Sequence, residues 1–396
     1  MAALTHLFYE DWANLPDLVL TQVFSYLSEV ERCRIGATCR HWLQYLDTSQ
    51  HWRTFNCVFC LPADRKQVKC IEKYGHFISR LTIYINHTQE ENTNNALAVL
   101  NHLSSLENVH LSYLSIVLTG EILMGDVIDN FNKGLQTLLT KIGQNKEKST
   151  LKHLTVPYII FMYNIDNLID CISSACPNLE YLNISINPFP FYIWLNVVAD
   201  RMKILVLNCR QIQVLCFPYS SLSDNVLKAL SQAGRKPLQR LEIVCTRYDT
   251  IPLLYKAWSH NTSSEGWSSL VTAHPGLKVV LKFQFGCHCI SEIMMPGIPV
   301  QELCLDVPSL DIPIYPEINK AVVYYEQMLE KLVVSCDPSR ELQESILNAA
   351  RRCKKLKALY VYCVLDKDVI DQILELCPLM RDTKDYILKW TNDPEP

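Results

Sequence analysis

Residues 14–46 contain three consecutive segments with helical patterns: NLPDLVLTQVFSYL (14–27), SEVERCRIGA (28–37) and TCRHWLQYL (38–46). Pro16 suits a first helical turn, because the N–H that proline lacks has no intrahelical partner there. Apolar residues follow at i, i+3, i+4 and i+7, the spacing of one helical face: Leu20, Val23, Phe24 and Leu27. Ser28 followed by Glu31 is typical of a capping box that opens a second helix, and Thr38 is a suitable cap for a third.

Three helices of roughly ten residues each form a core too small to hide all of these apolar side chains. Each large apolar side chain left in water forgoes about 1.5–3 kcal/mol. The excess apolar surface comes from Leu15, Pro16, Val19, Val23, Phe24 and Trp42. The segment therefore predicts a helical module that a partner surface completes.

Leu15-Pro16, the step Val23-Phe24-x-x-Leu27 and the motif Cys39-Arg40-x-Trp42 resemble the F-box. Asp17 keeps the acidic residue that many members of that family carry after Leu-Pro. The resemblance implies a three-helix hook, here expected over residues 10–56, that binds the adaptor Skp1 and through it Cul1 and Rbx1. The residues expected to contact Skp1 are Leu15, Pro16, Val19, Leu20, Val23, Phe24, Leu27 and Trp42. The alternative is a hydrophobic helical cap on the following domain.

The composition is that of a globular chain, with 49% hydrophobic and 20% charged residues and a net charge of −4. A chain without net positive charge lacks the electrostatic signature of a nucleic-acid binder. Glycine is scarce, at 11 of 396 residues, which disfavours phosphate-binding loops. No nucleotide-binding or hydrolase motif occurs, so neither a cofactor nor a catalytic residue is predicted. No apolar run reaches about 18 residues, so no membrane span is expected.

The 17 cysteines occur in a chain whose first ten residues lack the pattern of a signal peptide. We therefore expect a cytoplasmic or nuclear protein whose cysteines stay mostly reduced and act as small buried hydrophobes. Cys57-x-x-Cys60 with Cys70 and His76 is spaced wrongly for a structural zinc site. The run 287–289 (CHC) would place its histidine on the opposite strand face from its thiols. No metal site is predicted.

A short apolar segment recurs along the rest of the chain at intervals of about 23 to 45 residues, with helical stretches between the copies. The copies are centred on residues 81–83, 109–111, 154–156, 182–184, 205–207, 241–243, 277–283, 303–305, 332–334 and 359–361. The clearest unit, CPNLEYLNI (176–184), is matched closely by CKKLKALYV (353–361).

This pattern is typical of stacked strand–helix units that bury a continuous core. It resembles the irregular leucine-rich repeats found behind F-boxes. The predicted fold class is α/β: an N-terminal three-helix F-box, then a leucine-rich-repeat solenoid over residues 57–390 with a curved parallel sheet, then a tail over 391–396. Insertions are expected at 113–149 and 249–274, and residues 47–60 are interpreted as a structural joint.

Strand alternation predicts one exposed sheet face that could bind a protein target. Its candidate residues are Tyr84, His110, Asn183, Glu242, Asp306, Tyr360 and Tyr362. The leading hypothesis is a non-enzymatic substrate receptor of an SCF-type ubiquitin ligase, which acts by proximity alone. One alternative is a scaffold that binds Skp1 without engaging the cullin, and another is a hydrolase within the solenoid.

Overall fold

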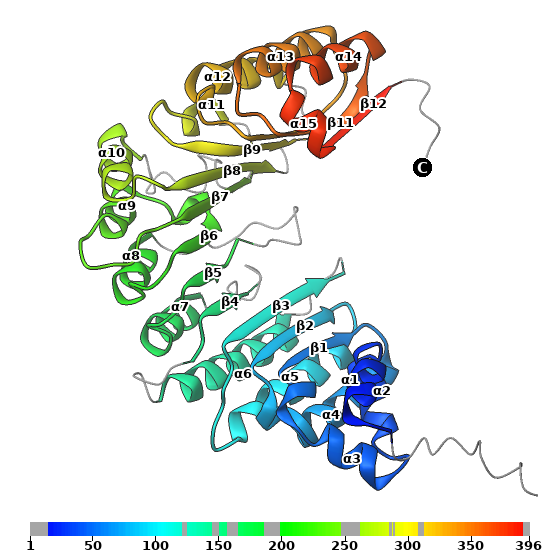
Figure 1. Ribbon diagram of the computed structural model, residues 1–396. Coiled ribbons are helices and arrows are strands. Elements are labelled where there is room, and N and C mark those ends of the chain that lie inside the picture. Colours follow the sequence, from blue (N-terminus) through cyan, green and yellow to red (C-terminus); the bar gives the residue numbers. More distant parts are fainter. Residues whose placement is uncertain are drawn as a thin grey trace, which may run out of the picture. The chain divides into compact units, whose positions relative to one another are not determined.

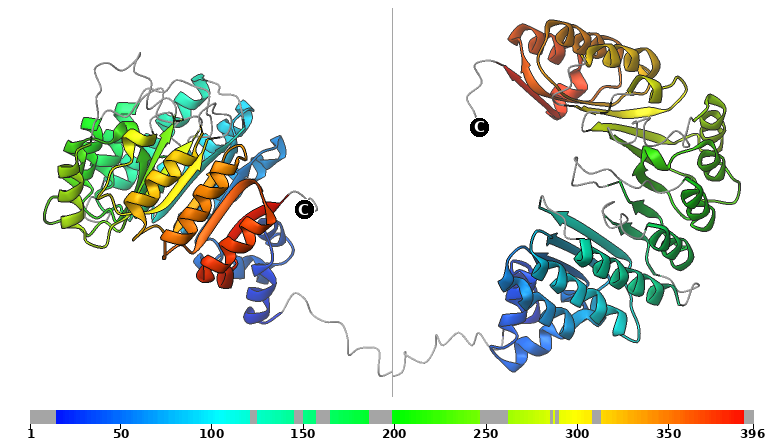
Figure 2. Two further views of the ribbon diagram at one scale, coloured as in Figure 1. Left: turned by 90° about the horizontal axis from the view of Figure 1, so that it is seen from above. Right: turned by 180° about the vertical axis from the view of Figure 1, so that it is seen from behind.

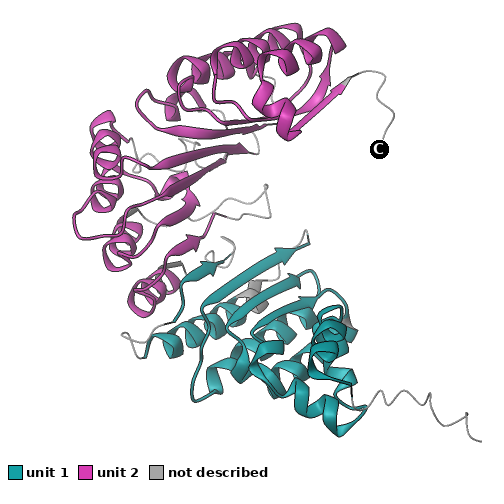
Figure 3. Cartoon of the chain, in the orientation of Figure 1, with its two compact units in different colours: residues 1–156 teal, residues 157–396 magenta. Residues whose placement is uncertain are grey.

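The computed structural model describes residues 15–120, 125–144, 150–156, 165–185, 199–246, 262–284, 287, 290–307 and 313–390. The chain divides into two compact units, residues 1–156 and residues 157–396 (Figure 3). In each unit strands alternate with helices, and successive strands pair in parallel (Figures 1 and 2). Parallel pairing requires a crossover between strands, and the intervening helices supply it. The repeating architecture confirms the predicted class.

Unit 1 begins with three short helices: α1 (Asp17–Ser25), α2 (Glu29–Ile35) and α3 (Arg40–Leu46). Pro16 is the N-cap of α1, one position before the expected one. The capping box is confirmed, because the Ser28 side chain accepts from the Glu31 N–H while the Glu31 carboxylate accepts from the Ser28 N–H. The prediction for Thr38 was wrong: its hydroxyl donates to the Ile35 carbonyl, and the next residue, Cys39, caps α3 through its sulfur.

The rest of unit 1 consists of strand–helix units. Its elements are β1 (Thr54–Phe59), α4 (Lys66–Tyr74), β2 (Arg80–Asn86), α5 (Glu90–Ser105), β3 (Tyr113–Thr119), α6 (Gly125–Gly143) and β4 (His153–Thr155), with 3-10 turns at Ser49–His51, Pro62–Arg65 and Gly75–Phe77. One fully buried residue per strand forms a ladder across the sheet: Phe55, Leu81, Leu114 and Leu154. Helices α4 to α6 lie on one face of this sheet (Figure 2).

Unit 2 repeats the same plan with more units. Its helices are α7 (Ile165–Ala175), α8 (Ala199–Asn208), α9 (Asp224–Leu230), α10 (Ser264–Ala273), α11 (Ile290–Ile293), α12 (Tyr315–Tyr325), α13 (Arg340–Arg352), α14 (Lys367–Leu376) and α15 (Pro378–Thr383), with a 3-10 turn at Tyr219–Ser221. Its strands are β5 (Tyr181–Asn183), β6 (Val214–Pro218), β7 (Arg240–Thr246), β8 (Lys278–Gln284), β9 (Val300–Asp306), β10 (Lys331–Ser335), β11 (Ala358–Leu365) and β12 (Tyr386–Trp390). Leu281, Leu303, Leu332 and Leu359 form a buried ladder of the same kind.

Two of the predicted strand segments were wrong. Residues 109–111 precede β3 rather than form it, and residues 205–207 lie inside α8. The buried residues around α8, Met202, Leu205, Val206 and Cys209, follow the i, i+3, i+4, i+7 spacing of a helix. Strands β1, β3, β6 and β12 were missed.

The insertion expected at 113–149 was wrong, because β3 and α6, the strand and helix of one repeat unit, occupy most of it. Helix α10 lies at the end of the segment 249–274, half of which is outside the described residues. Residues 10–14, 288–289 and 391–396 are also outside the described residues. The domain boundaries at 10–56 and 57–390 stay a prediction.

The expectation of buried, reduced thiols holds at Cys176, Cys353, Cys363 and Cys377, which are buried and free, while Cys171 is free and half-buried. One pair departs from the expectation of reduced thiols. Cys33 of α2 and Cys70 of α4 are joined as a disulfide, with their Cα atoms 6.3 Å apart.

Candidate protein-docking site

Helix α1 carries apolar side chains on its inner side and on part of its outer side. Leu20 and Phe24 face inward and are at most 1% exposed, whereas Leu18 is 85% and Tyr26 80% exposed. Val19 and Val23, one turn apart, are also exposed. Pro16 lies exposed at the start of the same surface. The helix therefore presents an apolar outer face that no described residue of the chain covers.

Two residues of the predicted Skp1 contact set, Leu20 and Phe24, are buried within the hook. The Phe24 ring packs edge-on against Trp42, with centroids 5.6 Å apart, and lies 5.7 Å from the ring of Tyr45. Phe24 therefore lies at the centre of the hook's own core. Leu20 and Phe24 hold α1 in place through its buried side. Leu15, Leu27 and Trp42 are half-buried, and the His41 ring contacts the Leu15 carbonyl at 3.2 Å.

The sequence reading missed Leu18 and Tyr26. A helical stripe was assigned to Leu20, Val23, Phe24 and Leu27, and the apolar residues outside that stripe were passed over. The available signal was that the apolar residues of this segment outnumber the positions of one helical stripe, which indicates a second apolar side.

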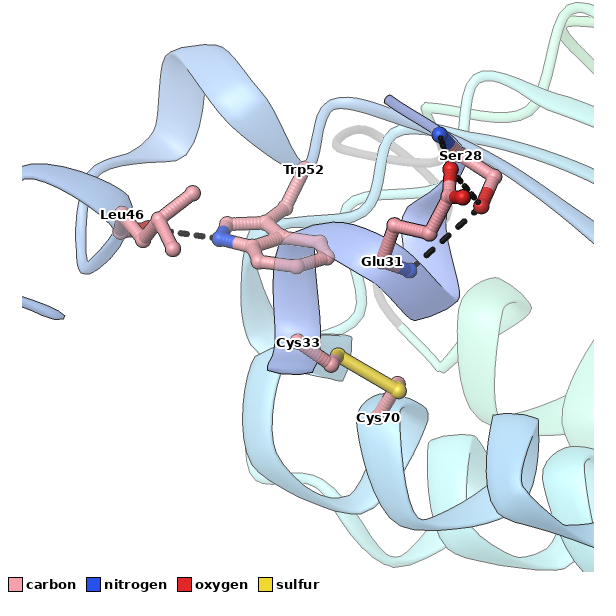
Figure 4. Close-up of a disulfide and its surroundings, with 6 residues drawn as sticks. All are labelled: Ser28, Glu31, Cys33, Leu46, Trp52 and Cys70. Atoms are coloured by element: carbon pink, nitrogen blue, oxygen red, sulfur yellow. Dashed lines mark hydrogen bonds between the residues drawn. A yellow bond between two sulfur atoms is a disulfide. The ribbon is translucent and has the colours of Figure 1, made fainter. Parts of the chain in front are cut away.

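Trp52 joins the hook to the first repeat, as predicted for residues 47–60 (Figure 4). Its side chain is fully buried, and its indole N–H donates to the Leu46 carbonyl at 2.6 Å. The indole stacks on Tyr74 of α4 with ring centroids 4.0 Å apart and an interplanar angle of 8°. Arg32 of α2 lies over the same indole and donates to the Leu27 carbonyl. The stack of Trp52 on Tyr74 thus packs the hook against α4, while the two hydrogen bonds fix Trp52 and Arg32 within the hook.

Burial around this joint also affects His51, which lies next to Trp52 in the chain. Its ring packs against Tyr45, with centroids 4.7 Å apart. Burial, with a smaller contribution from the Arg32 guanidinium, holds the pKa of His51 below its usual value. The neutral imidazole is therefore favoured in the folded hook.

The candidate target-binding residues differ in exposure. Tyr84 in unit 1 and Tyr362 in unit 2 are exposed at 38% and 54%, as strand alternation predicts. Asn183, Asp306 and Tyr360 are half-buried. Tyr360 donates a hydrogen bond to Asp385, and the Lys331 ammonium lies 4.5 Å from its ring centroid. His110 is exposed but lies in the loop before β3, so strand alternation does not place it.

Glu242 contradicts the expectation of an exposed residue. It lies on the predicted strand face but is only 8% exposed, because neighbouring side chains fold over it. Lys282 pairs with it at 2.5 Å and Arg240 at 3.4 Å, and Arg240 also binds Glu302 at 2.6 Å. Register places Glu242, Val280 and Glu302 in one row across β7, β8 and β9.

The electrostatics of this network follow from its pairing. Hydrogen bonding to Glu302 raises the pKa of Arg240 above its ordinary value. Burial pushes the pKa of Glu302 upward, but the hydrogen bond and charge of Arg240 outweigh burial and leave that pKa below its usual value. Sequence reasoning found only Glu242 of this network.

A family model described as F-box-like matches residues 12–58. The chain is 23% identical to the human F-box/LRR-repeat protein 8 over 98% of both chains. It is 23% identical to the mouse F-box/LRR-repeat protein 21 over 93% of this chain and 80% of that protein, and 19% identical to the human F-box only protein 33 over 88% and 72%. None of the described helices is both long and apolar enough to cross a membrane.

Proposed function

Because the chain carries an N-terminal F-box-like domain and is distantly homologous along its length to F-box/LRR-repeat proteins 8 and 21, we propose that it is a substrate-recognition subunit of an SCF-type ubiquitin ligase. The observation that carries the proposal is the uncovered apolar face of α1. In this role the α1 face docks Skp1, and Skp1 links the chain to Cul1 and Rbx1. The chain itself contributes no bond chemistry.

The contact set for Skp1 follows from exposure. Its members are Leu15, Pro16, Leu18, Val19, Val23, Tyr26, Leu27 and Trp42, which are exposed or half-buried. Covering each large apolar side chain contributes about 1.5–3 kcal/mol before the costs of association. Leu18 and Tyr26 have the most surface left to bury and are the expected energetic anchors.

The strand faces are the proposed target-binding surfaces. Tyr84 in unit 1, and Asn183, Asp306, Tyr360 and Tyr362 in unit 2, are accessible there. Exposed aromatic side chains are frequent anchors of protein interfaces. A target held on such a surface has a raised effective concentration of its lysines near a ubiquitin-loaded enzyme, and this proximity is the whole catalytic contribution.

Co-purification tests the Skp1 step. The full chain is expressed with Skp1, Cul1 and Rbx1, and the wild type is compared with Leu18→Ser plus Tyr26→Ala. The variant should bind Skp1 roughly 30-fold or more weakly, because two anchors together contribute about 2 kcal/mol or more. Val323→Ser, at a residue of α12 that is 59% exposed, is the matched control and should bind like the wild type.

Unchanged Skp1 recovery with the double variant would reject the α1 face as the docking surface. Recovery of Skp1 without Cul1 and Rbx1 would replace the ligase role by that of a Skp1-binding scaffold.

A further inference from the structure

A cavity of about 240 Å³ lies between α2 and α4, around the Cys33–Cys70 pair. Figure 4 shows the pair bridging the two helices. The cavity lining combines both cysteines with apolar and basic side chains: Val30, Cys33, Arg34, Lys66, Lys69, Cys70, Lys73 and Tyr74. The cavity lies entirely within unit 1 and is separate from the α1 docking face.

The lining is strongly basic. Arg34, Lys66, Lys69 and Lys73 all contribute to it, and no acidic residue does. In the part of the chain that the structure describes, none of these four side chains forms a salt bridge. The Lys73 ammonium lies 4.8 Å from the ring centroid of Tyr74, which does not neutralise it.

The spacing of the lysines on α4 concentrates this charge. Lys66, Lys69 and Lys73 stand at i, i+3 and i+7, and Lys69 and Lys73 are neighbours at i, i+4. Like charges at that spacing destabilise a helix. Bound anionic groups would relieve this repulsion. The side chains of Val30 and Tyr74 in the lining would contact a small organic body.

The two cysteines differ from the chain's other thiols in their surroundings. Cys33 is half-buried, Cys70 is 5% exposed, and both line the cavity. Nearby ammonium and guanidinium groups stabilise a thiolate, the reactive form in thiol–disulfide exchange. At several other cysteines burial disfavours the thiolate: it raises the pKa of the Cys209 and Cys216 thiols to about 12. Cys33 and Cys70 differ from them in lining a cavity that contains four cationic side chains.

We propose that Cys33 and Cys70 form a reversible thiol–disulfide site whose exchange partner is a small acidic thiol of the glutathione class, bound by Arg34, Lys66, Lys69 and Lys73. The reaction starts at Cys33, the more exposed sulfur. Its thiolate attacks one sulfur of glutathione disulfide, forming a mixed disulfide and releasing one glutathione thiolate. The Cys70 thiolate then attacks the Cys33 sulfur and releases the second. Two protein thiols are oxidised and one glutathione disulfide is reduced to two thiols.

The consequence is a covalent tie between the hook and the first repeat. In the reduced protein, α2 is held to α4 by non-covalent packing such as the contacts of Trp52 with Arg32 and Tyr74. In the oxidised protein the Cys33–Cys70 bond joins the two helices directly. The proposal is independent of Skp1 docking, because no residue of the α1 face lines the cavity.

Oxidation of the purified, fully reduced chain tests the proposal, with peptide mass spectrometry to locate the new bonds. Each variant is treated with glutathione disulfide, neutral hydroxyethyl disulfide and cationic cystamine. Lys66→Gln plus Lys69→Gln plus Lys73→Gln should slow the reaction with glutathione disulfide roughly tenfold at low salt and accelerate the reaction with cystamine. The rate with each reagent is compared between the wild type and the variants, so differences in reactivity between the reagents cancel. Lys354→Gln, outside the cavity, is the matched control and should change neither rate.

Single-cysteine variants test the order of the steps. Cys70→Ser should accumulate the mixed disulfide on Cys33, because the resolving thiol is gone. Cys33→Ser should react several-fold more slowly, since Cys70 is the less exposed sulfur. Equal effects of the lysine substitutions on all three reagents, or failure to form the Cys33–Cys70 bond, would overturn the proposal. Preferential labelling of the half-buried Cys39 or Cys60 would overturn it as well.

Discussion

Helices α1 and α13 both carry apolar side chains, but they differ in how many of these side chains are buried. Helix α13 buries Leu342, Ile346 and Leu347 and turns Arg340, Glu341 and Glu344 to solvent. Helix α1 buries only Leu20 and Phe24 and leaves Leu18 and Tyr26 largely in water. A repeat helix has neighbours of its own kind to cover its apolar face, since α13 packs between α12 and α14. Among the described residues, none covers the outer side of α1, and we propose that Skp1 does so.

The largest effect is expected at the contact between the hook and the first repeat. Trp52→Ala removes a fully buried indole, its hydrogen bond to Leu46 and its stack on Tyr74. We expect a loss of about 3–5 kcal/mol in the free energy of unfolding of unit 1. Unfolding in denaturant, monitored by hydrogen exchange in each unit, measures the change in the free energy of unfolding.

Trp267→Ala provides the comparison for Trp52→Ala. Trp267 is 2% exposed and belongs to α10 of unit 2. Its removal should destabilise unit 2 and leave exchange in the hook unchanged. If both variants lost the same protection from hydrogen exchange in the hook, the claim that Trp52 specifically stabilises the hook would be contradicted.

The next largest effect concerns the tie between α2 and α4. The Cys33–Cys70 link has a sequence separation of 37 residues. Closing a loop of that size lowers the entropy of the unfolded chain and so stabilises the folded state by about 3–4 kcal/mol. The oxidised protein should therefore unfold at higher denaturant concentration than the reduced one, in unit 1 only. The variant Cys33→Ser plus Cys70→Ser should be insensitive to reductant. If reductant still lowered the stability of this variant, the stabilisation would not come from the Cys33–Cys70 bond.

The ionic network on the strand face predicts a smaller effect. Glu242→Gln leaves the charges of Arg240 and Lys282 beside a nearly buried neutral side chain, so we expect a loss of about 1–3 kcal/mol in unit 2. Glu344→Gln removes a pair with Arg340 whose side chains are 66% and 90% exposed, and should cost less than about 0.5 kcal/mol. Chemical denaturation of the two variants compares them directly, and equal losses would refute the distinction.

A further small effect is a pH dependence of the stability of unit 1. Burial, aided by the Arg80 guanidinium, lowers the pKa of His153 from 6.5 to about 4, and its ring stacks on Tyr113. Between these two pKa values the unfolded chain binds the proton and the folded chain does not. The stability of unit 1 should therefore fall as the pH drops from about 6.5 to about 4, by about 1 kcal/mol after solvent screening of a half-buried ring.

His153→Gln should flatten that part of the stability profile, whereas His110→Gln, at an exposed loop position, should not. Identical profiles for the wild type and His153→Gln would remove His153 as the cause.

The features that could be predicted from sequence are those encoded by neighbours in the chain. The capping box of Ser28 and Glu31 needs residues three apart, and the buried ladder residues Leu81, Leu303 and Leu332 stand in short alternating segments. The choice between the two apolar sides of α1 depends on Trp42 and Tyr45, which lie about twenty residues downstream. Local pattern carries no information about that choice.

Two further features were out of reach for the same reason. Alternation placed Glu242 on the correct strand face, but its burial depends on Lys282, forty residues away in sequence. Cys33 and Cys70 meet because α2 packs on α4, and no spacing rule pairs one cysteine of the hook with one of the first repeat.

The surface of α1 as the docking site for Skp1 is tested most directly by hydrogen exchange of the full chain with and without Skp1. We expect slower exchange across residues 17–27 and unchanged exchange in α13 when Skp1 is bound. The Leu18→Ser plus Tyr26→Ala variant should lose this protection. Exchange across residues 17–27 that Skp1 does not alter, or that it slows equally in the variant, would contradict the account.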